Sequence, residues 1–210
     1  MPRLDEGFFA RPCLEVARDL LGCLLIHHVP EAEPRIGRIV EAEAYLGEGK
    51  DAASHAHRGP TRRNRAMFGP PGRFYVYLSM GLHVCANVVC EAEGRGAAVL
   101  LRAVEPLEGL EGMRDARGGR DGVELTNGPG KLSQAFGITL DHYGCSALTG
   151  TLRIEPPRTH TPLPILRSAR IGLSRATDKP YRFFVAENRY VSRSPLNQRA
   201  RRIRAAGPGL

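Results

Sequence analysis

Strand-forming segments follow one another in this sequence without regular helices between them. Apolar and polar residues alternate, as in strands, over residues 36–43, 73–78, 83–90, 97–104, 152–155 and 182–186. Helical periodicity is confined to residues 12–25, where Gly22 interrupts it, 107–117, where Gly118 ends it, and 131–136. A doubly wound parallel sheet needs strands and helices in regular alternation, so this order predicts a mixed α+β domain. Gly81, between residues 73–78 and 83–90, predicts a β-hairpin.

The chain has the length of one domain with a substantial core, and no linker divides it. It contains 210 residues, and we expect a single domain over residues 1–195. Residues 196–210 are rich in arginine, and we expect them to form a disordered tail. Residues 50–71 are polar and punctuated by glycine and proline, which predicts a long surface loop with a helical turn at residues 64–68. Loops of this length in compact domains are usually functional or mobile.

The charge of the chain suits a polyanionic partner. Its formal net charge is +8, with 30 basic and 22 acidic residues. All but three of the basic residues are arginines, and an arginine bias can also reflect genome composition, so charge alone does not identify nucleic acid as the partner. The five cysteines form no CxxC pair, which indicates buried thiols in a reducing compartment. The longest apolar run, residues 20–26, is too short to cross a bilayer, so we expect a cytoplasmic protein without a membrane partner.

Two carboxylates and an aromatic ring lie close together at the end of a predicted strand. Glu41, Glu43 and Tyr45 project on one side of this strand, which Gly47 then breaks. A carboxylate beside an aromatic ring can serve an acid–base site that holds a flat ligand, or it can form a solvated edge. These residues alone do not decide between Glu41 and Glu43. Arg102 stands inside the apolar run of residues 99–104, where a guanidinium is costly unless it is paired.

Seven ordered segments carry a resemblance to a known family. In sequence order they are Phe8-Phe9-Ala-Arg-Pro12, Ile39-Val-Glu-Ala-Glu-Ala-Tyr-Leu-Gly47 with Ala53-Ser-His55, Arg63-Asn-Arg-Ala-Met-Phe68, Gly72-Arg-Phe-Tyr-Val-Tyr77 with His83-Val-Cys-Ala-Asn87, Ala98-Val-Leu-Leu-Arg102 with the residues to Leu110, Asn127-Gly-Pro-Gly-Lys-Leu132, and Arg170-Ile-Gly-Leu173 with Lys179-Pro-Tyr-Arg-Phe183. Together they resemble the alkyladenine (3-methyladenine) DNA glycosylase family over residues 8–192. No single segment is specific, but their order is.

The resemblance implies a fold and a catalytic pair. The fold is a single α+β domain with a curved, mostly antiparallel sheet, flanking helices and a protruding β-hairpin. Glu43 matches the family's general base, which deprotonates a water and stabilises the oxocarbenium-like sugar. Arg102 matches an arginine near the water and the target phosphate. Glu41 is then expected to fix neighbouring groups.

The resemblance also implies a pocket for an extruded base. Tyr45 corresponds to a tyrosine that stacks on the flipped base, and Tyr77 to the opposite wall. His55 corresponds to the histidine at the base edge, although the preceding loop is one residue longer here and His57 is a nearby competitor. Asn87 matches an asparagine that excludes purines with a 2-amino group. Met80 stands where the family commonly has a tyrosine that wedges into the base stack.

We therefore expect a monofunctional DNA glycosylase that removes alkylated or deaminated purines from duplex DNA, the first step of base excision repair. Such an enzyme acts as a monomer on damaged double-stranded DNA, at the nucleoid in a bacterium, and needs only water, with no metal and no cofactor. The pair His55 and His57 lacks a following Pro-Cys-x-x-Cys, which argues against a zinc deaminase. One alternative is a bifunctional glycosylase and lyase that uses Pro2 or Lys50 as an amine nucleophile. The other is a nucleic-acid-binding module without catalysis.

Overall fold

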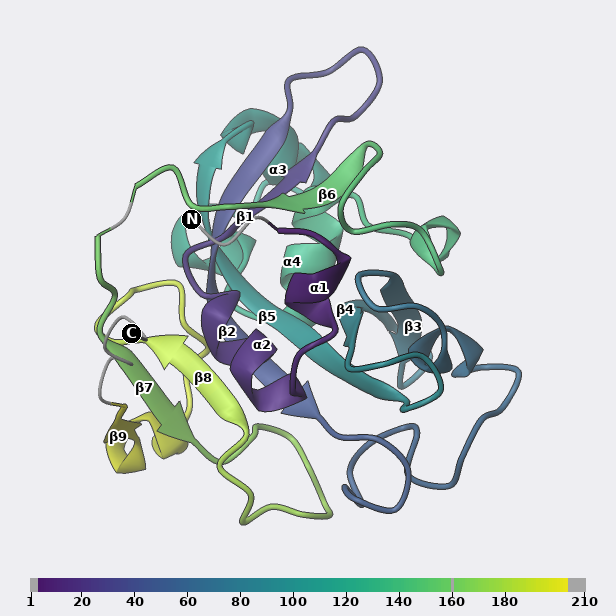
Figure 1. The fold of residues 1–210 in the computed structure, drawn as a ribbon. Helices are drawn as coiled ribbons and strands as arrows, with labels where there is room; N and C mark the ends of the chain where they lie inside the picture. Colours follow the sequence, from purple (N-terminus) through teal and green to yellow (C-terminus); the bar gives the residue numbers. More distant parts are fainter. Residues whose placement is uncertain (1–3, 160, 204–210) are drawn as a thin grey trace.

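The protein is a single α+β domain organised around one sheet (Figure 1). A computed structural model describes residues 4–159 and 161–203. The strands are β1 (Leu24–His27), β2 (Arg35–Tyr45), β3 (Phe74–Ser79), β4 (His83–Cys90), β5 (Ala97–Glu108), β6 (Leu152–Glu155), β7 (Ile165–Ser168), β8 (Arg182–Val185) and β9 (Arg201–Arg202). Their order is β3-β4-β5-β2-β8-β7-β9, with β1 pairing with β2 and β6, and all these pairs are antiparallel. The predicted fold class is confirmed.

Short helices pack against the middle of this sheet. The α-helices are α1 (Glu6–Phe9), α2 (Cys13–Asp19), α3 (Leu110–Ala116) and α4 (Pro129–Phe136). The 3₁₀-helices are η1 (Arg65–Phe68), η2 (Gly122–Leu125), η3 (Leu140–His142) and η4 (Pro195–Arg199). Helix α2 contacts β2 and β5, whereas α4 contacts β4 and β5. No helix in the described part of the chain combines the length and the apolar character that a bilayer-spanning segment requires.

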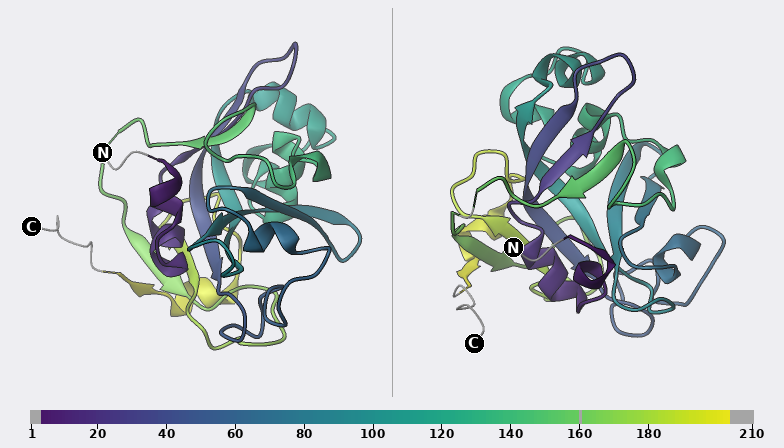
Figure 2. Two further views of the ribbon diagram at one scale, coloured as in Figure 1. Left: turned by 45° about the vertical axis from the view of Figure 1, so that its right-hand side comes forward. Right: turned by 45° about the horizontal axis from the view of Figure 1, so that its top comes forward.

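The predicted hairpin is present and projects from the domain (Figure 2). Strands β3 and β4 pair from Phe74 with Val88 to Ser79 with His83. The other edge of the sheet is β9, so the hairpin and the C-terminal segment lie at opposite ends of the strand order. Four strands, β5, β2, β8 and β7, therefore separate the hairpin from β9 along this order.

The predicted helix over residues 12–25 is wrong beyond Asp19. Residues 24–27 form β1 instead, and all four of them are buried. A strand covered on both faces is a continuous apolar run, which periodicity alone does not distinguish from a helix. Gly22 adopts a φ of +93° and its N–H donates to the Ile39 carbonyl at 2.8 Å, so the chain turns here toward β2.

The structure differs from two further predictions, the start of the helix at residues 107–117 and the disorder of the C-terminal tail. Strand β5 continues to Glu108, so the helix predicted over residues 107–117 begins only at Leu110. The expected disordered tail contains η4 and β9, and β9 pairs with β7, a strand that the sequence patterns did not indicate. Residues 204–210 of that tail lie outside the described residues.

Gly47 marks a close backbone approach just after β2. A Cβ atom built there would lie 1.8 Å from the carbonyl oxygen of Arg95, in the connection between β4 and β5. Because the obstacle is main chain, no side-chain rotation removes it. Gly112 differs, since the nearest atom to its Cβ would be the Arg35 Nε at 3.4 Å, at the end of a flexible side chain.

We expect Gly47→Ala to lower the free energy of unfolding by about 2–4 kcal/mol, because the backbone must shift to admit the methyl group. Gly112→Ala, inside α3, is the matched control and is expected to be neutral or to stabilise by about 0.5–1 kcal/mol. Urea unfolding midpoints of the three proteins measure both effects. Equal stabilities for the two variants would contradict this reading of Gly47.

Candidate active site

Six of the seven predicted site residues line one cavity beside the hairpin. This cavity has a volume of about 430 Å³, which is in the range of small-ligand sites. Its walls include Tyr45, His55, Tyr77, Met80, Asn87 and Arg102. They come from β2, the loop after it, the hairpin and β5, so the sheet order itself assembles the cavity. His57, the competitor of His55, does not line it.

The seventh residue, Glu43, lies directly behind the wall of this cavity. Its side chain is fully buried, and its carboxylate accepts three hydrogen bonds. Oε2 accepts from the Tyr45 hydroxyl at 2.9 Å and from the Arg102 guanidinium at 3.2 Å, and Oε1 accepts from the Ile171 N–H at 2.8 Å. All three donors belong to residues that line the cavity. Burial and the neighbouring Glu43 raise the pKa of Tyr45 well above its usual value, so its hydroxyl keeps the proton that it donates.

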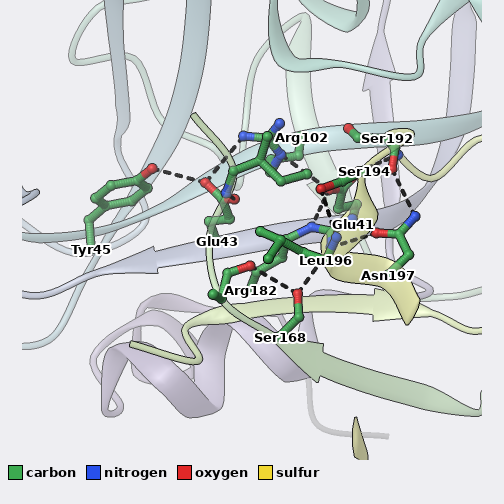
Figure 3. Close-up of polar contacts among 12 residues, drawn as sticks. Glu41, Glu43, Tyr45, Arg102, Ser168, Arg182, Ser192, Ser194, Leu196 and Asn197 are labelled. Carbon is green, nitrogen blue, oxygen red and sulfur yellow. Dashed lines mark hydrogen bonds and ion pairs between the residues drawn. The ribbon is translucent and has the colours of Figure 1, made fainter. Parts of the chain in front are cut away.

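Glu41 forms the centre of a buried charge network with two arginines (Figure 3). Its Oε1 accepts from Arg182 Nε at 2.6 Å and from Arg102 Nε at 3.1 Å, while Oε2 accepts from the Ser192 N–H at 2.7 Å. Burial opposes ionisation, but Arg102 and Arg182 outweigh it and hold the pKa of Glu41 below its usual value. The expectation that Glu41 fixes its neighbours agrees with these contacts.

The network continues from Glu41 to the C-terminal segment. Arg182 has no exposed surface, and its Nη1 donates to Ser168 Oγ at 3.0 Å and to Asn197 Oδ1 at 2.9 Å (Figure 3). Asn197 in turn donates to the Ser192 carbonyl at 3.1 Å. Two carboxylates and two guanidiniums thus balance in charge within the core, which removes most of the cost of burying any one of them.

A second buried ion pair supports Tyr45 from behind. Arg170 and Asp51 have fully buried side chains and form a two-pronged contact, at 2.5 Å and 2.8 Å. Asp51 also accepts from the main-chain N–H groups of Leu46 and Ala53, which ties the loop to the end of β2. The Arg170 guanidinium lies 4.5 Å from the centroid of the Tyr45 ring. It occupies one face of this ring, so the other face remains for a flat ligand in the cavity.

His55 is held in a defined orientation at the wall of the cavity. Its Nδ1 lies 2.9 Å from the Tyr75 hydroxyl, and its ring meets Tyr77 edge-on with centroids 4.6 Å apart. Its carbonyl accepts from Asn64 Nδ2 at 2.8 Å, which anchors the surface loop. Burial, helped by the nearby Arg63, lowers the pKa of His55, so the imidazole is neutral near pH 7. Burial also raises the pKa of Tyr75 to about 12, which keeps its hydroxyl protonated.

Asn87 and Tyr77 complete the wall on the hairpin side. Asn87 is buried and donates from Nδ2 to the Tyr75 carbonyl at 3.0 Å. Tyr77 stacks on Tyr75 with ring centroids 5.4 Å apart. The hairpin register places Asn87 opposite Tyr75 and Cys85 opposite Tyr77, so pairing of the two strands sets this part of the cavity.

Met80 is exposed in a strained conformation at the hairpin tip. Its side chain is 83% exposed, and its φ is +48°. The turn is closed by the Leu82 N–H and the Ser79 carbonyl at 3.0 Å, and its central residues Met80 and Gly81 are both left-handed. Asparagine or glycine is the stable choice for such a turn, and a methionine there costs about 1–2 kcal/mol. The stability of the turn therefore does not explain why a methionine occupies this position.

The sequence patterns assigned no role to Asp51, Arg170 or Arg182, although each fixes a residue of the site. Arg182 could have been found by the argument used for Arg102, because it too is an arginine next to apolar residues in a predicted strand. Arg170 and Asp51 lie in loops, where nothing in the local pattern marks them as buried.

Comparison with known proteins identifies the family of this chain. The sequence profile of one family, described as Methylpurine-DNA glycosylase, matches residues 7–189. Similar chains include one from Methanoculleus marisnigri, 49% identical over 193 residues that cover 90% of this chain and 98% of the relative. Another, from Chlorobaculum tepidum, is 47% identical over 194 residues that cover 92% of each chain. Both relatives are named, provisionally, as 3-methyladenine DNA glycosylases. The chain belongs to the methylpurine-DNA glycosylase family.

Proposed function

We propose that this DNA glycosylase hydrolyses the N-glycosidic bond of an alkylated or deaminated purine that has been flipped out of duplex DNA. The observation that carries the proposal is the buried Glu43 carboxylate behind a cavity with aromatic walls. A base that stays in the stack cannot reach such a cavity, so the substrate nucleotide has to leave the helix first.

Glu43 acts in this reaction as the general base. A water molecule next to the carboxylate attacks C1′ of the deoxyribose while the bond from C1′ to the purine nitrogen breaks. The electrons of that bond go to the purine, and the water gives a proton to Glu43. Positive charge that develops on the sugar is stabilised by the same carboxylate. Tyr45, Arg102 and the Ile171 N–H hold its oxygens in place during this step.

The leaving base determines how much further help is needed. An alkylated purine carries a positive charge and leaves as a neutral molecule, so no acid is required. A deaminated purine is neutral, and its departure depends more on contacts at its edge. His55 supplies such a contact, because its Nδ1 is engaged by Tyr75 and its Nε2 remains for the ligand. Tyr45 and Tyr77 stack on the base, and Asn87 excludes purines with a 2-amino group.

The remaining parts of the proposal concern partners. Met80 enters the base stack as the flipped nucleotide leaves it, which accounts for an exposed and strained methionine at this point. The enzyme acts as a monomer on damaged double-stranded DNA in the cytoplasm, at the nucleoid if the cell is bacterial. Water is the only co-substrate of the hydrolysis, so the reaction calls for no metal and no cofactor.

Two alternatives are less well supported. A lyase needs an amine in the cavity, but Lys131 is paired with Glu124, Lys179 lies against Asp178, and neither these lysines nor Lys50 line the cavity. Pro2 lies outside the described residues. A binding module without catalysis has no use for Glu43, whose burial costs folding energy unless its partners are in place.

We expect Glu43→Gln to slow release of the purine by at least about a hundredfold under single-turnover conditions, because the amide cannot take the proton from water. Affinity for a duplex with a stable abasic analogue is expected to change only a few-fold, since glutamine keeps the shape of the side chain. Glu48→Gln, at an exposed glutamate just after Gly47, is the matched control and is expected to retain full activity.

Release of purine by Glu43→Gln at a rate close to that of the unchanged protein would contradict the role of Glu43. Loss of duplex binding together with loss of activity would point to a collapsed site instead. Thermal unfolding of both variants separates these two outcomes.

We also expect an intact abasic strand as the product, without an imine between protein and DNA. Borohydride added during turnover is expected to trap no covalent adduct, because no lysine lines the cavity in the described part of the chain. A trapped adduct would overturn the monofunctional mechanism. If Lys50→Ala no longer formed the adduct, the nucleophile would be Lys50. An adduct that persisted in this variant would point to Pro2.

A further inference from the structure

The exposed large hydrophobic side chains of the described residues gather at one place. They are Leu78 at 38% exposure, Met80 at 83%, Leu82 at 75% and Leu140 at 50%, and we call this set the apolar tip. Leu78, Met80 and Leu82 belong to the end of the hairpin, whereas Leu140 comes from η3, which packs against β3. Soluble surfaces rarely keep such a cluster without a partner.

Leu140 is presented by a well-fixed element. Thr139 caps η3, since its hydroxyl accepts from the Asp141 N–H and its own N–H donates to His142 Nδ1 at 3.1 Å. The chain after η3 is bonded to β3, where the Phe74 carbonyl accepts from the Gly144 N–H at 2.8 Å. The exposure of Leu140 is therefore built into the fold, and it does not result from a loose loop.

The apolar tip is continuous with the base cavity. Leu78, Met80 and Leu140 line a shallow hollow of about 590 Å³ on the outer side of the hairpin. Three residues, Arg63, Tyr77 and Met80, border both this hollow and the base cavity. A duplex that delivers a nucleotide into the cavity consequently lies across the hollow as well.

The charges around the hollow fit duplex DNA better than another apolar partner. Arg62, Arg63 and Arg65 are exposed on the loop and helix beside it, and Arg63 donates to the Leu78 carbonyl at 2.9 Å. The minor groove of DNA is complementary to this surface. Phosphates along its rims can pair with the arginines, and the deoxyribose on its walls offers apolar surface to the leucines.

We propose that Leu140 and Leu78 form an apolar minor-groove contact next to Met80. Met80 fills the gap left by the flipped nucleotide, and the two leucines cover deoxyribose and base-edge surface of the adjoining base pair. This inference rests on the proposed function, because it requires duplex DNA with one nucleotide in the cavity. It adds a residue from outside the hairpin, Leu140, to the surface that holds the duplex open.

Duplex binding by Leu140→Ser tests this contact. The probe is a duplex with one tetrahydrofuran abasic analogue, compared with the same modified strand alone, over a series of salt concentrations. We expect about tenfold weaker duplex binding, equivalent to ~1.4 kcal/mol, and unchanged binding of the single strand, which has no minor groove. The salt slope is expected to stay constant, because an apolar contact releases no counterions.

Three controls accompany this variant. Val29→Ser alters a half-buried apolar residue in the connection between β1 and β2, and is expected to leave binding unchanged. Leu140→Met keeps an apolar side chain and is expected to restore most of the affinity. Arg63→Gln is expected to lower the salt slope by about one, as removal of a phosphate contact does.

Unchanged duplex affinity of Leu140→Ser would overturn the inference, and so would an equal loss on the single strand. A loss that follows a change in oligomeric state, measured by sedimentation, would assign the apolar tip to a second copy of the chain and also overturn it. Purine release by the unchanged protein is measured in the same series. If it is absent, the proposed function fails, whereas the binding comparison still decides the contact of Leu140.

Discussion

Two buried carboxylates on one strand constrain the whole domain. Glu41 and Glu43 are both fully buried on β2, and each needs a guanidinium from another strand. Arg102 comes from β5 on one side of β2, and Arg182 comes from β8 on the other. Removal of one partner from such a cluster would leave an uncompensated charge in the core, at a cost of about 3–5 kcal/mol. Pairing of β2 with β5 and β8 therefore brings both carboxylates and both guanidiniums of the candidate site together.

The same network explains why the C-terminal segment belongs to the domain. Asn197 accepts from Arg182, and Ser192 donates its N–H to Glu41, so residues after β8 complete the hydrogen bonding of the buried charges. Composition predicted a disordered tail there, because arginine-rich ends often lack a core to pack on. Its described part instead contains η4 and β9, and β9 pairs with β7 at the end of the strand order opposite the hairpin.

Local patterns predicted the elements whose burial follows a simple period. The hairpin strands, the strand that carries Glu43 and the helix before Gly137 were all predicted, and an arginine inside an apolar run drew attention to Arg102. The patterns failed at β1, which is covered on both faces, and at β7, which follows a proline-rich passage. Choosing Glu43 over Glu41 required the family resemblance, since the two differ only in what folds around them. Asp51 and Arg170 were missed because their burial depends on contacts between distant loops.

The site divides the work between a rigid and an exposed part. Tyr45, Glu43 and Arg102 are held by hydrogen bonds and by ion pairs that are buried or nearly so, so their arrangement is set by the fold before any ligand arrives. The hairpin tip keeps the opposite character, with a left-handed methionine and exposed leucines whose cost is not recovered within the domain. In the proposed reaction, chemistry depends on the buried part and strand opening on the exposed tip.

The central claim is that Glu43, acting on water as a general base, drives release of a purine that already carries a positive charge. The most direct measurement is the pH dependence of single-turnover release of 3-methyladenine, in the unchanged protein and in His55→Gln. A general base is active only when deprotonated, so we expect the logarithm of the rate to rise with a slope of one and reach a plateau, in both proteins. A rate that falls as the pH rises would contradict this role of Glu43, because it would show that the reaction needs a protonated group. If His55→Gln abolished that fall, the protonated group would be His55.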